Sequence, residues 1–403
     1  MQAMQHPAPS PAVDPADEAY WSAIRAQFTA ASDFINLENG YFGIQPDPVL
    51  AAFTRYTAEA NAETARFLRL RFPPLLEAVM AELAEFTGAG TDELVITRNA
   101  TESMNILAQG YPFRPGDEVL LGSHDYDLFP PIFQLLARRK GIVLKQVEIP
   151  LHPQGDDEIL GCYERAMTPR SRVLLATHMI HLTGQILPVA KLSALARAHG
   201  VDVIADAAHS FAHLDFRLPD LGADFAAINL HKWLGAPLGT GLMYIRRERL
   251  GEIEQFFAEG IFPKGDIREL AHFGTTPPAA ILAVRDALAF HNGIGSRNKE
   301  ARLRWLKDYW MDRVEAIPGV SLVTPRDPAR SCAIGAFRIA GWEANRIADH
   351  LYEKHRIFSV GRPLQGGDCV RITPHLYNRP DELDRLVEAI GEMAERPPSQ
   401  FAR

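Results

Sequence analysis

A lysine and an aspartate, Lys232 and Asp206, are the residues of this chain best suited to chemistry. Asp206 ends the apolar run Val203-Ile204-Ala205, and Lys232 follows 26 positions later in Asn229-Leu230-His231-Lys232-Trp233. A lysine amine can form a Schiff base with an aldehyde, and a carboxylate can keep a pyridine nitrogen protonated. Pyridoxal phosphate needs both groups from its protein, so the pair predicts a site for that cofactor. An unpaired lysine in an apolar setting has no good structural explanation, which favours this interpretation.

Three motifs follow one another around this pair: Ile204-Ala205-Asp206-Ala207-Ala208-His209-Ser210, the pair His231-Lys232, and Gly239-Thr240-Gly241. Their order and spacing resemble the class V aminotransferases, most closely the isopenicillin N epimerase-like branch, from about Phe34 to the C-terminal helix. The resemblance implies a pyridoxal phosphate enzyme of fold type I, an α/β protein with a three-layer, mostly parallel sheet and a smaller C-terminal α+β domain. It also implies a homodimer with active sites at the interface and a small-molecule amino acid substrate.

The same resemblance assigns roles to residues along the chain. Lys232, Asp206 and His209 would be catalytic, with Asp206 on the pyridine nitrogen and His209 beside the phenolic oxygen of the cofactor. The cofactor would also contact Ala100, Thr101, Tyr126, His181, Asn229, His231 and, reaching from a partner subunit, Thr275. The substrate would contact Arg371 and the entry segment 36–43, through Asn39, Gly40 and Tyr41.

The segment Asn99-Ala100-Thr101-Glu102-Ser103 follows a predicted strand and opens a predicted helix. Backbone N–H groups at such a helix start, together with the Thr101 hydroxyl, can hold a phosphate at the positive end of the helix dipole. An ordinary N-cap is the alternative, and taken alone it would be preferred. The downstream Asp206 and Lys232 motifs favour the phosphate.

Tyr126 is expected to stack on the face of the cofactor ring, with His124 as second choice; a merely half-buried tyrosine is the alternative. His181 stands where many family members have a hydrogen-bonding residue, often Asn, so it is expected to donate to the phenolic oxygen, to transfer a proton or to be structural. The pairs His178-x-x-His181 and His209-x-x-x-His213 lack a carboxylate-bearing motif such as His-Glu-x-x-His. We therefore expect no metal site.

Arg371 lies in Val370-Arg371-Ile372-Thr373-Pro374-His375, a predicted strand of the small domain. Its guanidinium suits an α-carboxylate because it can donate two parallel hydrogen bonds; a surface ion pair is the alternative. The glycine-containing run 235–241 lacks the Gly-x-Gly-x-x-Gly order and a strand before it. It therefore indicates backbone passing close to the cofactor, not a dinucleotide loop.

Short β-branched runs alternate with helical stretches from about Glu93, which favours a mostly parallel sheet with helices on both faces. Strands are predicted around 94–97, 119–121, 142–144, 173–175, 201–204 and 225–228, and helices over 129–140 and 191–199. A helical stretch after Ala279 breaks at 293–295, and the small domain has strands near 335–339 and 370–373 and helices over 343–355 and 380–395. The predicted divisions are a flexible leader, 1–17; a segment packing on the small domain and active site, 18–45; a large cofactor-binding domain, 46–287; and a small domain, 288–403.

Composition limits the possible partners and compartment. A net charge of −8 disfavours binding to nucleic acid, and no apolar run is long enough to span a bilayer. The Pro- and Ala-rich start lacks the pattern of a signal peptide. Cys162, Cys332 and Cys369 lie far apart, which indicates neither a disulfide framework nor a zinc site and predicts a cytoplasmic location.

We therefore expect an enzyme that acts at the α-carbon of an amino acid. Lys232, once the substrate amine has replaced it on the cofactor, would move the α-proton. Epimerisation, transamination and elimination at a C–S or other bond all remain open. A cysteine desulfurase needs a nucleophilic Cys on a mobile loop, and the loop 361–367 has none, so Cys332 and Cys369 are interpreted as packing residues. Two further alternatives are a catalytically silent binding protein, disfavoured by the presence of Lys232, Asp206 and Arg371 together, and a nicotinamide-dependent dehydrogenase, disfavoured by the missing glycine fingerprint.

Overall fold

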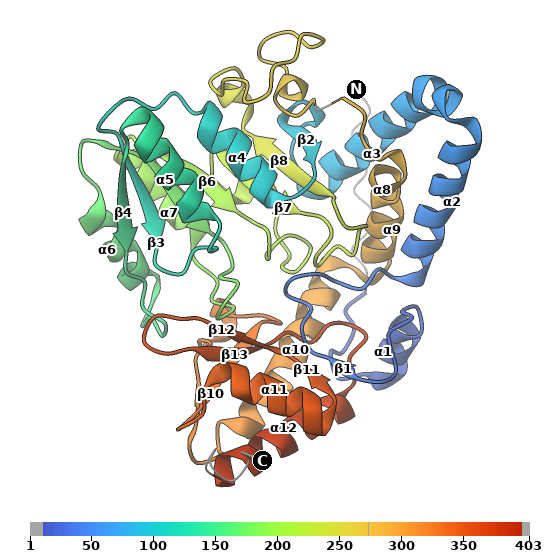
Figure 1. Cartoon of the computed structure of the whole chain (residues 1–403), viewed down its shortest axis with the longest axis vertical. Helices are drawn as coiled ribbons and strands as arrows, with labels where there is room; N and C mark the ends of the chain where they lie inside the picture. Colours follow the sequence, from blue (N-terminus) through green and yellow to red (C-terminus); the bar gives the residue numbers. More distant parts are fainter. Residues whose placement is uncertain (1–10, 273, 397–403) are drawn as a thin grey trace.

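Two β-sheets organise the chain in the computed structural model, which describes residues 11–272 and 274–396 (Figure 1). The larger sheet has seven strands in the order β2-β8-β7-β6-β5-β3-β4, and the smaller has four in the order β12-β13-β10-β9. We call the larger sheet with its helices the large unit and the smaller sheet with its helices the small unit. Figure 1 shows the small unit below the large one.

The seven-stranded sheet is parallel except for one strand. Its strands are β2 (Leu94–Thr97), β3 (Glu118–Gly122), β4 (Val143–Val147), β5 (Ser171–Thr177), β6 (Asp202–Asp206), β7 (Phe225–Asn229) and β8 (Gly241–Ile245). β8 runs antiparallel to both of its neighbours, β2 and β7. The expected mostly parallel α/β sheet is confirmed, and all six predicted strands are present; β8 is an addition that the sequence did not predict.

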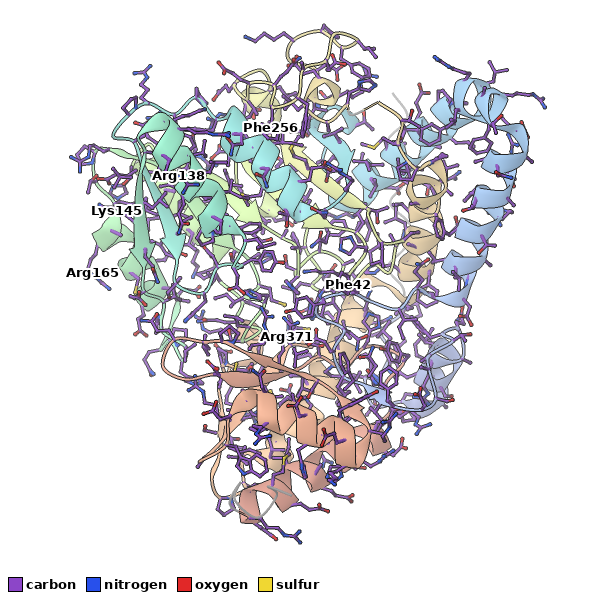
Figure 2. All side chains as sticks on the ribbon, viewed as in Figure 1. Phe42, Arg138, Lys145, Arg165, Phe256 and Arg371 are labelled. Atoms are coloured by element: carbon purple, nitrogen blue, oxygen red, sulfur yellow. The ribbon has the colours of Figure 1, made fainter. Side chains whose placement is uncertain are left out.

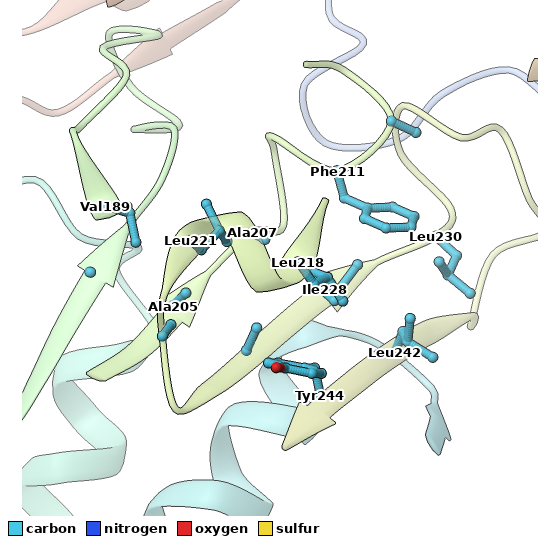
Figure 3. Close-up of a cluster of buried hydrophobic side chains, with 14 of the residues drawn as sticks. Val189, Ala205, Ala207, Phe211, Leu218, Leu221, Ile228, Leu230, Leu242 and Tyr244 are labelled. Carbon is cyan, nitrogen blue, oxygen red and sulfur yellow. The ribbon is translucent and has the colours of Figure 1, made fainter. Parts of the chain in front are cut away.

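Helices cover both faces of this sheet because its strands are apolar on both sides. In β6, Val203 and Ala205 join one buried cluster and Ile204 joins the other, as the two-residue period of a strand requires. The first cluster includes α6 (Asp156–Ala166) and α7 (Val189–Ala198), and Figure 3 shows part of it. The second includes α4 (Ala100–Gly110) and α5 (Phe129–Lys140).

A group of helices packs beside the β2 edge of the sheet and leads into the small unit. It consists of α2 (Asp47–Glu63), α3 (Phe72–Thr87), α8 (Pro278–Leu282) and α9 (Val284–Ile294), followed by α10 (Ser296–Val314). The predicted break between helices is at Gly295, whose φ of 87° a residue with a side chain rarely adopts. The proposed domain boundary after residue 287 falls inside α9. Single turns complete the large unit: a π-helical turn at Phe67–Arg71 and 3-10 turns at Thr91–Glu93, Leu218–Leu221, Arg247–Arg249 and Ile267–Leu270.

The small unit is an antiparallel sheet with two helices. It contains β9 (Val320–Leu322), the 3-10 turn Pro328–Arg330, β10 (Gly335–Ile339), α11 (Ala344–His355), β12 (Val360–Arg362), β13 (Cys369–Ile372) and α12 (Pro380–Glu395). The N-terminal segment joins it, because β1 (Ile35–Asn36) pairs in parallel with β11 (Ile357–Phe358).

The start of the chain contacts α10, the helix that leads into the small unit. Residues 1–10 of the expected leader lie outside the described residues. The Val13 N–H donates to Asn298 Oδ1, and Arg302 donates to the Pro15 carbonyl, so this part of the leader is held against α10. The helix α1 (Glu18–Arg25) follows. Within residues 11–272 and 274–396, no helix is both long and apolar enough to cross a bilayer.

Candidate active site

The carboxyl ends of three central strands meet at one edge of the large sheet. Thr177 at the end of β5 lies opposite Asp206 at the end of β6, and Asp206 lies opposite Ala227 of β7. The segments that leave these strands carry His181, His209 and Lys232. This edge is where open α/β sheets bind ligands, and a cavity of about 280 Å³ lies there.

Most of the predicted site residues line this cavity: Tyr41, Ala100, Thr101, Tyr126, His181, Asp206, His209, Asn229, His231, Lys232 and Arg371. The lining also includes Phe42, Asn99, Leu238 and Gly239, which lie in segments that the sequence predicted to be near the site, and Phe129 and Ala208, which had no predicted role. Figure 2 shows Arg371 where the small unit faces the large unit, with Phe42 near it. The cavity is therefore built by both units and by the entry segment.

Asp206 is buried in this cavity, and Lys232 is half-buried beside it. The Lys232 Nζ lies 2.9 Å from His209 Nε2. Burial lowers the pKa of Lys232, and the negative charge of Asp206 opposes that shift. Burial likewise raises the pKa of Asp206, against a hydrogen bond that its Oδ1 accepts from the Ala208 N–H at 2.9 Å and against the charge of Lys232. The burial of Lys232 thus favours the neutral, nucleophilic amine.

The entry segment packs directly on the backbone that presents Lys232. A Cβ added at Gly43 would lie 2.5 Å from the Lys232 carbonyl oxygen, so only glycine fits this approach. The same carbonyl accepts a hydrogen bond from the Gly235 N–H at 3.2 Å, and Gly235 has a φ of 79°. The glycine-containing run therefore makes a turn directly after Lys232, and Gly239 of this run lines the cavity.

The start of α4 combines both interpretations of its sequence. Asn99 is an N-cap whose Oδ1 accepts from the Glu102 N–H at 2.9 Å. The Ala100 N–H donates to Asn229 Oδ1 at 2.9 Å, which ties the helix start to the end of β7. Among the described residues, none accepts a hydrogen bond from the Thr101 N–H or hydroxyl. These donors, at the positive end of a helix, suit a phosphate group.

Tyr126 is positioned by its buried neighbour Asp125. Tyr126 lines the cavity and meets the His181 ring edge-on at 5.2 Å, whereas the second choice, His124, is buried outside the lining. Asp125 accepts from the Thr177 hydroxyl at 2.6 Å and from the Gly122 N–H at 2.7 Å, so it fixes the turn before Tyr126.

Several polar atoms of the cavity are buried without a partner. They are both ring nitrogens of His181 and the Nδ1 of His209. Burial lowers the pKa of both imidazoles, so each keeps a neutral ring with one donor and one acceptor. Buried polar groups nearly always have partners, so these orphans, with the Thr101 donors and the Lys232–Asp206 pair, fit a bound polar ring that carries a phosphate.

Arg371 does not form the surface ion pair considered as an alternative, because its side chain is only 1% exposed. It forms a buried pair with Glu38, through Nε to Oε2 at 3.1 Å and Nη2 to Oε1 at 2.6 Å. Its Nη1 donates to the His181 carbonyl at 2.7 Å. Glu38 belongs to the predicted entry segment, but its pairing with Arg371 was not predicted.

Three predicted contacts lie outside the cavity lining. Asn39 is turned toward the small unit, where its Nδ2 donates to the Thr373 carbonyl at 2.8 Å and its Oδ1 accepts from the Tyr377 hydroxyl. Gly40 lies behind Arg371, since a Cβ there would be 2.9 Å from Arg371 Cζ. Thr275 is exposed and away from the cavity of its own chain, so its expected role across a subunit interface stays a prediction.

Comparison with known proteins gives one consistent family and several activities. The model of the family "Aminotransferase class-V" matches residues 43–386. An isopenicillin N epimerase of Amycolatopsis lactamdurans is 30% identical over 395 residues, covering 93% of this chain and 98% of that protein. A probable cysteine desulfurase of Methanothermobacter thermautotrophicus is 28% identical, covering 92% of this chain and 97% of that protein.

Solved structures share the whole fold. A cysteine desulfurase from Thermococcus onnurineus NA1 matches with a TM-score of 0.84 and 22% identity, over 93% of this chain and 98% of that one. The cystine C–S lyase C-DES, in complex with its product cysteine persulfide, matches with a TM-score of 0.82 and 23% identity, over 91% and 99%. A C-DES mutant in the same set holds glycine covalently linked to its pyridoxal phosphate cofactor.

Proposed function

The chain belongs to the class V aminotransferase family of pyridoxal 5'-phosphate enzymes, and on this premise we propose that it acts at the α-carbon of an amino acid, in a reaction of aminotransferase or epimerase type. Lys232 would anchor the cofactor and then move the α-proton. The observation that carries this proposal is the position of the Lys232 Nζ, 2.9 Å from His209 Nε2 in a cavity that Asp206 also lines.

Each residue has a task that follows from its surroundings. Bound pyridoxal phosphate supplies an aldehyde that takes up the substrate amine and a pyridinium ring that accepts the electron pair left at the α-carbon. Asp206 would hold the proton on the ring nitrogen, because a cation beside it favours its ionised form. Burial lowers the pKa of Lys232, so its Nζ is free to accept the α-proton. His209 would orient that Nζ through their hydrogen bond.

The phosphate site would consist of donors on two elements. We assign it the start of α4 at Ala100, whose N–H is shared with Asn229 Oδ1, the N–H and hydroxyl of Thr101, and the side chains of Asn229 and His231. The Nδ1 of His231 is within hydrogen-bonding distance of the Thr240 carbonyl, at 2.8 Å, which fixes the ring over the same edge. Thr275 of the partner subunit would complete the site in a homodimer.

Tyr126 would stack on the face of the cofactor ring, with His181 beside it. Both line the cavity, and the burial of His181 keeps it neutral, so it can donate one hydrogen bond and accept another. Arg371 would hold the substrate α-carboxylate, and Tyr41 would bound the substrate side, since its ring lies 4.8 Å from the Arg371 guanidinium carbon.

A second candidate reaction is β-elimination from a sulfur-containing amino acid, as a C–S lyase. It is supported by the probable cysteine desulfurases among the relatives and needs the same Lys232. A persulfide on a protein cysteine is not supported, because the loop 361–367 contains no cysteine. Burial also raises the pKa of the Cys369 thiol to about 11 and that of Cys332 to about 12, so neither is a ready nucleophile.

The deciding experiment is an amino-acid panel in deuterated water with the holoenzyme. Exchange of the α-proton, measured by mass spectrometry, is expected for at least one amino acid, because every reaction proposed begins with its removal. Keto acid, inverted configuration or released sulfide then identifies the reaction. Lys232→Ala should abolish the exchange. Undiminished exchange in that variant, or a panel that neither exchanges nor perturbs the visible absorption of the cofactor, would overturn the proposal and favour a silent binding protein.

A further inference from the structure

A carboxylate of the protein already occupies the arginine that faces the substrate. Glu38 and Arg371 are 3% and 1% exposed, and their two hydrogen bonds use the Nε and Nη2 edge of the guanidinium. Glu38 is itself held in place, since its Oε1 also accepts from the Tyr41 N–H at 3.0 Å. The pair is therefore a fixed part of the cavity wall.

The guanidinium keeps some donors for a second anion. Arginine has five N–H bonds, of which Glu38 uses two and the His181 carbonyl uses one. The two that remain lie on Nη1 and Nη2. A substrate carboxylate can therefore still reach Arg371, but it would share one positive charge with Glu38. Two carboxylates beside one cation in a buried setting repel each other.

The other arginine of the cavity region has its own carboxylate. Arg362 Nη2 lies 3.3 Å from Asp127 Oδ2, and its guanidinium donates to the Tyr41 hydroxyl. Both guanidinium carbons lie near the Tyr41 ring, at 4.8 Å from its centre for Arg371 and 5.1 Å for Arg362. Of these two cations Arg371 lines the cavity, so a ligand carboxylate there meets a cation that is already paired.

We infer that Glu38 is a specificity-determining residue that competes with the substrate carboxylate for Arg371. It lowers the affinity of the site for a carboxylate at Arg371 relative to an uncharged group of the same shape. This inference rests on the proposed function, because it takes the α-carboxylate to bind at Arg371. Glu38 contacts Arg371 and not the reacting atoms, and its charge also opposes the lowering of the Lys232 pKa.

Acetate is a suitable probe, with acetamide as its uncharged counterpart. We would measure the dissociation constant of each for the holoenzyme by isothermal titration calorimetry and by the change in cofactor absorption. Glu38→Gln removes the charge, while its amide oxygen can still accept from the Tyr41 N–H. It should bind acetate at least tenfold more tightly than the wild type, equivalent to about 1.4 kcal/mol. Acetamide binding should not change.

Two further variants test whether the gain in acetate affinity depends on Arg371. In an Arg371→Met background, adding Glu38→Gln should give no gain in acetate affinity. Glu118→Gln is the matched control, because Glu118 is a fully buried carboxylate paired with Arg170 and Lys145 at the amino end of β3, far along the sheet from the cavity. It should leave acetate binding unchanged.

Glu38→Ala serves as a second variant if Glu38→Gln does not fold, and the same gain is expected from it. Equal or weaker acetate binding in a folded Glu38 variant, or a gain that persists without Arg371, would overturn the inference. These titrations need no turnover. A failed deuterium exchange with a positive acetate result would therefore refute the proposed function and leave the competition for Arg371 standing.

Discussion

Replacing Arg371 with alanine should have two separable effects, one on folding and one on recognition. The variant leaves the Glu38 carboxylate, only 3% exposed, without its cation, which should lower the free energy of unfolding by about 3–5 kcal/mol. The substrate carboxylate would also lose a charge-assisted, two-bond partner. That loss should cost about 3 kcal/mol of transition-state stabilisation, which lowers kcat/KM on the order of a hundredfold.

Two companion variants separate these effects. Arg371→Lys should recover only part of the recognition, because one ammonium cannot reproduce a planar two-bond contact. The double variant Arg371→Met with Glu38→Gln removes both charges at once. It should regain most of the stability without regaining recognition, because replacing a whole buried ion pair costs far less than breaking one.

The assay compares kcat/KM for an amino acid that the enzyme turns over with kcat/KM for the matching amine that lacks a carboxylate. Unfolding in urea, followed by tryptophan fluorescence, reports the stability of each variant. We expect the wild-type preference for the amino acid to collapse in Arg371→Ala while the cofactor remains bound. Equal losses on both substrates, or no loss, would show that Arg371 does not recognise the carboxylate.

Two further predictions concern groups away from the reacting atoms. Burial lowers the pKa of Lys299 from 10.5 to about 7, so the unfolded chain binds a proton that the folded chain does not. The folded state should therefore lose up to about 1.4 kcal/mol of stability per pH unit as the pH falls from 10 to 7, and no more below that. Lys299→Met should remove this pH dependence. The measurement is the free energy of unfolding in urea for both proteins, and a difference between them that does not change from pH 10 to pH 7 would contradict the prediction. Replacing Cys162, Cys332 and Cys369 with alanine should leave turnover largely intact, since two of the thiols are buried with raised pKa values; loss of activity in a folded Cys369→Ala variant would revive a desulfurase mechanism.

Local signals explain why much of the fold could be predicted from the sequence. The helix α5 has the predicted bounds because its apolar spacing and its terminal Gly141, with a φ of 71°, are both local. The helix α12 likewise begins at Pro380, which favours the first turn of a helix. β8 could not be predicted in this way. Its five residues are a strand because β2 and β7 pair with it on both sides, and those contacts are not local.

The same distinction applies to the site. Asp206, His209 and Lys232 could be proposed because each follows closely on a recognisable strand, and such ends converge in a parallel sheet. The pairing of Glu38 with Arg371 joins residues 333 positions apart and exists only because the entry segment and β13 pack together. The Asp127–Arg362 pair, 235 positions apart, likewise depends on how the small unit docks on the large one.

The central claim is that Lys232 holds the cofactor, and the most direct measurement is to find which lysine does. Reduction of the holoenzyme with sodium borohydride fixes the cofactor to its lysine, and peptide mass spectrometry then locates it. We expect the modification on the peptide that contains Lys232. Lys299 offers a real alternative, since it is buried and also has a lowered pKa. Modification at Lys299, or at any lysine other than Lys232, would contradict the account.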